Sequence, residues 1–135
     1  MKKGIYRILT LVLALMMVLG LAACGDSGSA GNADDTLYIG LAVPLTGDSA
    51  MYGETVRDGV QFGVDEINAN GGIDGKQVVL VIEDDKGNNS EAAMVAQKLA
   101  EDDRLFCVIG HVNSSCTLVG IPIYADAGLT VLNTS

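Results

Sequence analysis

The chain has few of the residues on which metal sites and disulfide frameworks depend. It contains one histidine, His111, and three cysteines among 135 residues. Neither Cys107 nor Cys116 has a partner at metal-ligand spacing, so the sequence predicts no metal and no cofactor. Cys107 lies in an apolar strand pattern and Cys116 follows a turn, on elements expected to diverge. A disulfide needs Cα atoms within about 7 Å, and we therefore expect two free, mostly buried thiols.

Basic residues are also scarce, with eight lysines and arginines against seventeen aspartates and glutamates. Three of the eight precede residue 24, so the rest of the chain carries five basic and seventeen acidic side chains, a net charge of −12. An acidic surface of this kind argues against nucleic acid or anionic lipid as a partner.

The longest apolar run is too short to cross a membrane. Residues 1–23 begin with basic residues, continue as "ILTLVLALMMVL" and end in small residues. This layout is typical of a secretory signal peptide. The alternative, a transmembrane anchor, needs about 20 apolar residues. We therefore expect export from the cytoplasm.

The end of this segment, "LAAC", resembles the lipobox of bacterial lipoproteins, in which the cysteine becomes the lipidated first residue. The resemblance implies a lipid anchor at Cys24, and two or more acyl chains together give stable membrane attachment. Residues 25–35 are rich in Gly, Ser and Asp. Residues 24–35 are therefore predicted to be a flexible tether.

From Thr36 onward, short apolar runs alternate with helical patterns. We expect strands at 36–43, 77–83, 105–110 and 129–133, and helices at 54–70, after Ser90 and at 114–128. Ser90 is expected to cap the second helix, and Pro122 to kink or divide the third. The predicted buried stripes are Val56, Val60, Val64 and Ile67 in the first helix, and Ala92, Val95, Ala96 and Leu99 in the second.

This β-α-β order predicts an α/β fold, a doubly wound parallel sheet. Because no helix follows the fourth strand, residues 36–135 look like a partial lobe, and we expect the chain to be truncated. If the strand order is 2-1-3-4, the order reverses between the first and third strands. Ligands bind at such a reversal, here between Pro44–Gly53 and Gly110–Ser115.

Two serines begin the helix that follows the third strand. The unpaired N–H groups and the dipole of a helix start favour an anion such as a carboxylate. The hydroxyls of Ser114 and Ser115 could donate to such a ligand or simply cap the helix. From the residues alone, both interpretations remain open.

Several motifs then recur in a characteristic order: "PLTG" with "YG", "DEINANGGI", "DD" after the second strand, and "IGH" followed by "SS". With them, residues 36–135 resemble the amino-terminal part of type I periplasmic binding proteins for branched-chain amino acids. Members of this family have two α/β lobes that close over the ligand. The resemblance implies an extracytoplasmic lipoprotein on the cell membrane, not an enzyme, that delivers a small amino acid to an ABC permease.

The resemblance also implies five ligand-binding positions. Ser114 matches the hydroxyl that binds the α-carboxylate, and Val112 and Asn113 match residues beside it. Tyr52 matches an aromatic residue of the side-chain pocket. Ser135 matches the start of a loop that holds the same amino acid.

There are departures from the family pattern. Gly87 and Asn113 stand where some members have a disulfide, so that bridge is absent. Because we expect the chain to be truncated, we also expect it to lack the second lobe and the acidic residue that, in the family, pairs with the ammonium group. We expect such a half-site to bind weakly, because closure desolvates and strengthens the polar contacts. The alternatives are a module for amides or urea, a sensory receptor, and a truncated product without binding activity.

Enzymatic interpretations have weaker support. Asp84 and Asp85 resemble the acidic pair of receiver domains, but the next strand lacks a phosphorylatable aspartate, so a solvated loop is expected there. "GGIDGK" fails the spacing of a phosphate-binding loop. His111 has serine and cysteine neighbours but no evident orienting carboxylate. We expect His111 to stabilise its turn.

Overall fold

The computed structural model describes residues 36–134, so the predicted signal peptide, the tether, Cys24 and Ser135 lie outside the described part. The elements are β1 (Thr36–Val43), α2 (Ala50–Ala69), β2 (Gln77–Asp84), α3 (Asn89–Ala100), β3 (Leu105–Gly110), α4 (Ser114–Asp126) and β4 (Thr130–Leu132). All strand pairs are parallel and the order is β2-β1-β3-β4. The predicted parallel α/β sheet and its order are confirmed.

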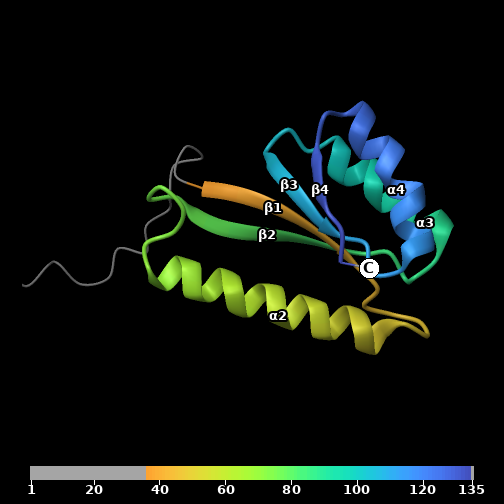
Figure 1. The fold of residues 1–135 in the computed structure, drawn as a ribbon, viewed down its shortest axis with the longest axis horizontal. Coiled ribbons are helices and arrows are strands. Elements are labelled where there is room, and N and C mark those ends of the chain that lie inside the picture. Colours follow the sequence, from red (N-terminus) through yellow and green to blue (C-terminus); the bar gives the residue numbers. More distant parts are fainter. Residues whose placement is uncertain (1–35, 135) are drawn as a thin grey trace, which may run out of the picture. The chain divides into compact units, whose positions relative to one another are not determined.

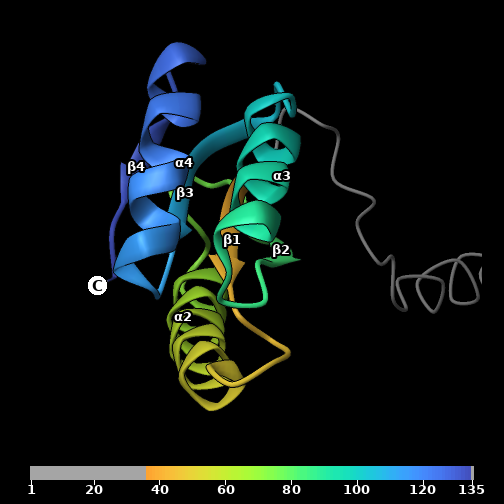
Figure 2. The ribbon, with the colours of Figure 1, turned by 90° about the vertical axis from the view of Figure 1, so that its right-hand side faces the viewer.

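The helices cover the two faces of the sheet (Figures 1 and 2). Helix α2 packs on β1 and β2 from one face, while α3 and α4 lie side by side on the other. The main apolar core lies beneath α3 and α4 and includes Ala42, Leu105, Val108 and Tyr124. The stripe predicted for α3 is confirmed, since Ala92, Val95, Ala96 and Leu99 are all buried.

Helix α2 differs from its prediction at its start and in its burial. It begins at Ala50 rather than Glu54, because Gly53 lets the first turn pack against the preceding loop. A Cβ on Gly53 would lie 1.8 Å from the carbonyl oxygen of Pro44. Of the predicted stripe only Val64 is buried, and Ile67 is 38% exposed. The glycines after Asn70 end the helix as predicted, with φ of 98° and 80°.

Two smaller predictions differ from the structure, the cap of α3 and a division of α4 at Pro122. The N-cap of α3 is Asn88, and Ser90 donates to the Asn88 side chain instead of capping. Pro122 does not divide α4, which is continuous. The carbonyl that loses its partner belongs to Leu118, which is 72% exposed, so water can satisfy it.

The outer strands depart less from expectation. Strand β4 is one residue shorter at each end than predicted. Strand β2 lies at the edge of the sheet, so Val78 is buried but Val79 is 42% exposed. Among residues 36–134, no helix has the length and apolar character needed to cross a membrane.

Candidate functional site

Two loops meet where the strand order reverses. Residues 44–49 follow β1, residues 111–113 follow β3, and β1 and β3 are neighbours in the sheet. From these loops α2 and α4 begin on opposite faces. Their N-cap residues touch, because Asn113 Nδ2 donates to Ser49 Oγ at 3.3 Å. The first turns of the two helices are thus held close together at the predicted position.

Neither helix satisfies its own N-terminus with a side chain. The N-caps Ser49 of α2 and Asn113 of α4 make no side-chain cap hydrogen bond, and neither first turn contains an acidic residue. Ser114 and Ser115 are exposed and do not occupy the cap position. The capping interpretation of these serines is therefore wrong. In α2 the amides of Ala50, Tyr52 and Gly53 donate to the carbonyls of Gly47 and Ser49. In α4 the first such bond comes from Thr117, so the earlier amides and the helix dipole favour an anionic ligand there.

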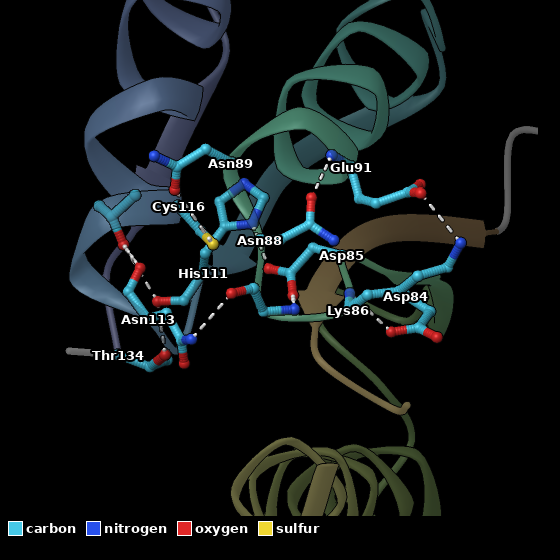
Figure 3. A network of polar contacts seen from close by, with 12 residues as sticks. Asp84, Asp85, Lys86, Asn88, Asn89, Glu91, His111, Asn113, Cys116 and Thr134 are labelled. Atoms are coloured by element: carbon cyan, nitrogen blue, oxygen red, sulfur yellow. Dashed lines mark hydrogen bonds and ion pairs between the residues drawn. The ribbon is translucent and has the colours of Figure 1, made fainter. Parts of the chain in front are cut away.

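The loop after β3 is built on a buried histidine (Figure 3). His111 Nδ1 lies 2.6 Å from Asp85 Oδ2, and both side chains are fully buried. Because a carboxylate can only accept, Nδ1 carries a proton. Burial, and then the charge of Asp85, raise the pKa of Tyr124. Its hydroxyl stays protonated and lies 3.2 Å from His111 Nε2, to which it can donate.

The backbone of this loop is equally constrained. The carbonyl oxygen of His111 accepts from Thr117 Oγ1 at 3.1 Å and from Thr134 Oγ1 at 3.2 Å, which ties α4 and the segment after β4 to the turn. Gly120 leaves room for the ring, since a Cβ there would lie 2.8 Å from His111 Nε2. Gly110 has φ of 129°, and its Cβ would lie 2.1 Å from Ala42 O. His111 therefore stabilises the turn, as predicted.

The buried aspartate corrects two predictions. Asp85 is not in a solvated loop, and it is the orienting carboxylate that the sequence did not reveal. The arrangement is still not that of a nucleophile and base, because Nε2 faces Tyr124 rather than Ser114 or Cys116, and His111 is fully buried. The buried side chains of Asp85, His111 and Tyr124 instead support the loop after β3.

The loop after β1 is held by the other aspartate. Asp84 Oδ1 accepts from the Leu45 amide at 2.7 Å, and Asp84 Oδ2 accepts from Thr46 Oγ1 at 2.6 Å. Its Oδ1 also accepts from the Lys86 amide at 2.9 Å. Burial opposes ionisation, but these hydrogen bonds together hold the pKa of Asp84 below its usual value.

The predicted site residues divide into three groups. Asn113 and Ser114 lie at the start of α4, with Val112 half-buried just before them. Tyr52 lies on the first turn of α2 rather than in a loop, and is 66% exposed. Ser135 lies outside the described residues, so its role stays a prediction.

Sequence reasoning missed the residues that hold the two loops. The loops are held by Thr46, Ser49, Asp84, Asp85 and Thr134. The available signal was the pair of aspartates at the carboxyl end of a strand, the edge where ligands bind.

The two thiols within the described residues are free and buried, as predicted. Cys107 is 6% exposed and Cys116 is fully buried. Burial raises the pKa of both thiols, and the charge of Asp85 adds to the effect at Cys116. Across residues 36–134 no group of His, Cys, Asp and Glu is arranged to hold a metal ion.

Comparison with known proteins agrees with this geometry. The periplasmic binding protein family matches residues 36–135. The chain belongs to this family. The "Leucine-, isoleucine-, valine-, threonine-, and alanine-binding protein" of Pseudomonas aeruginosa is 39% identical over the whole chain, which covers 34% of that relative. A Leu/Ile/Val-binding protein homologue of Brucella abortus is 35% identical over 84% of the chain and 30% of its own length.

Solved structures give the same result. The branched-chain amino acid transporter substrate binding protein LivJ from Streptococcus pneumoniae, in complex with isoleucine, is 37% identical with a TM-score of 0.71. The match covers 74% of this chain and 29% of that one. A Desulfitobacterium hafniense substrate-binding protein in complex with Leu is 32% identical with a TM-score of 0.63. That match covers 73% of this chain and 28% of the other. The fold is part of a type I periplasmic binding protein lobe, and the chain spans about a third of these relatives.

Proposed function

We propose that this chain is part of the solute-binding component of an ABC importer, and that it binds a small branched-chain amino acid outside the cytoplasm. In this proposal it delivers the amino acid to a membrane permease and catalyses no reaction. Relatives named for leucine, isoleucine and valine binding, and structures containing isoleucine or leucine, support this ligand class.

One observation carries the proposal: the two uncapped helix starts meet through the contact between Asn113 and Ser49. Neither N-cap side chain accepts from its own first turn. The α2 amides of Ala50, Tyr52 and Gly53 donate to backbone carbonyls instead, so the α4 amides are the ones proposed to hold a ligand. A carboxylate between the two helix starts would interact with both helix dipoles. In this proposal the exposed Ser114 hydroxyl donates to the carboxylate, and exposed Tyr52 contacts the apolar side chain of the ligand.

The anionic end of the ligand is therefore the first thing to test. Isothermal titration of the full chain should compare isoleucine, leucine and valine with leucinol, which lacks the carboxylate, and with acetamide and urea. We expect heat from the amino acids and none from leucinol. Binding of leucinol as strongly as leucine would refute the carboxylate site. Heat from amides or urea alone would retain a binding role but reassign the ligand.

Attachment to the membrane is proposed from residues 1–35. Cys24 would carry the acyl chains, and the following residues would tether the lobe. Expression in a bacterial host should place the wild-type chain in the membrane fraction with a diacylglycerol mass increment. The Cys24→Ala variant should lack that increment. An unmodified wild-type Cys24 would contradict the lipoprotein proposal.

A further inference from the structure

Two adjacent aspartates lie where strand β2 ends and the next loop begins. Asp84 is the last residue of β2, and Asp85 comes directly after it. Successive side chains of an extended chain point to opposite faces of the sheet. The two carboxylates accordingly point in different directions (Figure 3). None of the ligand-binding positions inferred above belongs to β2, so these acids need another explanation.

Asp84 holds the loop after β1. Its carboxylate accepts from the Leu45 amide at 2.7 Å and from the Thr46 hydroxyl at 2.6 Å. A weaker contact of 3.4 Å reaches the Thr46 amide. This loop leads into Ser49, the N-cap of α2. The carboxylate therefore fixes the first part of the loop that leads to α2.

Asp85 holds the loop after β3 by two routes. Directly, Oδ2 binds His111 Nδ1 at 2.6 Å. Indirectly, Oδ1 accepts from the Gly87 amide at 2.9 Å, and the carbonyl of Gly87 accepts from Asn113 Nδ2 at 3.2 Å. His111 and Asn113 are the first and last residues of the loop before α4. The carboxylate therefore fixes where α4 begins.

We propose that Asp84 and Asp85 are positioning residues that divide the site between them, Asp84 orienting the α2 start and Asp85 the α4 start. Neither touches the ligand. The consequence for ligand affinity rests on the proposed function, whereas the division of the two loops does not.

Hydrogen exchange of the ligand-free full chain tests the division directly. In Asp84→Ala, exchange at the Leu45 and Thr46 amides should be faster by about tenfold or more, because hydrogen bonds to charged groups are lost. Segment 111–113 should be unchanged. In Asp85→Ala the pattern should reverse, with faster exchange at Gly87 and through 111–113.

Conservative variants separate positioning from a general structural role. In Asp84→Asn and Asp85→Asn, the amide oxygen can still accept from the backbone, so loop protection should largely return. The side-chain nitrogen of Asn at 85 would donate to His111 Nδ1, which moves the ring proton to Nε2. His111 is the only histidine in the chain, so its ¹⁵N spectrum reports this tautomer without overlap.

Asp102 provides a matched control. Its carboxylate accepts from Arg104 Nη2 at 2.7 Å, so it also forms a charged hydrogen bond. It lies just before β3, at the end of that strand opposite to the loop 111–113. Asp102→Ala should leave both loops unchanged. Equal acceleration of both loops in each aspartate variant, or none in either, would overturn the proposal. An unaltered His111 tautomer in Asp85→Asn would remove the direct route.

Isoleucine titration of the same variants separates the positioning role of the two aspartates from the proposed function of amino acid binding. If the alanine variants loosen their separate loops and also bind more weakly by about tenfold, both proposals stand. If the loops respond as described but the wild-type chain binds no amino acid, the positioning role stands and the proposed ligand is wrong.

Discussion

Helices α3 and α4 both begin after an asparagine, yet they use it in opposite ways. Asn88 has φ of −126° and ψ of 151°, and its side chain accepts from the Glu91 amide of its own helix. Asn113 has a similarly extended backbone, with φ of −85° and ψ of 125°, but makes no such cap. Its Nδ2 donates instead to Gly87 O and Ser49 Oγ. The first turns differ too, since α3 contains Glu91 where α4 contains buried Cys116.

The difference shows how a helix start becomes available to a ligand. At the start of α3 the neutral Asn88 side chain accepts from a first-turn amide, and the Glu91 carboxylate interacts favourably with the helix dipole. In α4 the asparagine side chain instead joins three loops, and the first-turn amides have no side-chain cap. Under the proposed function, the ligand carboxylate binds these amides. Backbone geometry does not distinguish the two ends. The partners of the asparagine side chain do.

The largest effect is expected when an acid is placed on the second residue of each helix. Ser115→Asp in α4 should lower isoleucine affinity by about 100-fold or more, because it sets a like charge beside the ligand carboxylate. Ser90→Asp in α3 is the matched control and should leave affinity unchanged. Isothermal titration measures both. Equal losses would contradict the distinction between the helix starts.

A smaller loss is expected from removing one donor. Ser114→Ala should weaken isoleucine binding by about 1–3 kcal/mol through loss of a charge-assisted hydrogen bond. Ser90→Ala should not change it. Unaltered affinity in Ser114→Ala would mean that the amides alone, or another site, hold the ligand.

Removing each asparagine should affect different properties. Asn88→Ala should lower the free energy of unfolding by about 1 kcal/mol, the usual contribution of an N-cap, without changing affinity. Asn113→Ala should lower affinity, because it breaks the contact between the α2 and α4 starts. Urea unfolding and ligand titration measure the two quantities. A loss of affinity in Asn88→Ala would break the comparison.

The smallest expected effect is that acid pH weakens the hydrogen bonds by which Asp84 holds the loop after β1. The pKa of Asp84 is lower in the fold than its ordinary value of 3.8, so its contribution is present above about pH 4 and lost as pH falls through the folded pKa. The cap of α3 is a neutral amide and should not respond. Between pH 5 and pH 3, protection of the Leu45 and Thr46 amides, measured as the exchange rate relative to the intrinsic rate at each pH, should fall more than protection of the Glu91 amide. The Asp84→Asn variant should not show this pH dependence. If the variant still shows it, a group other than Asp84 causes it.

The sequence predicts the sheet and the α3 stripe well, because each depends on a local repeat of apolar residues. It predicts the start of α2 poorly, since "TGDSAMYG" contains turn formers whose glycine serves close packing on Pro44. The burial of Asp85 was not predictable from its loop. Its partner His111 is 26 residues away, and a charge is buried only when such a partner is present.

The site was predicted in outline rather than in detail. A serine pair after a strand predicted where α4 begins, at Ser114. That this helix start binds the ligand stays a prediction, made because ligands favour the carboxyl edge of a parallel sheet. Which residue caps the helix could not be read from the sequence, since Asn88 and Asn113 have similar local surroundings. Only the tertiary contacts of Asn113 with Gly87 and Ser49 decide it.

The most direct test is a titration of the ¹⁵N-labelled chain with isoleucine, followed by amide chemical shifts. A carboxylate bound at the start of α4 should move the Ser114 and Ser115 amides most, with smaller changes at the first turn of α2. The amides of Asn89 to Glu91 should stay in place. Largest shifts at the α3 start, or at neither helix start, would contradict the account.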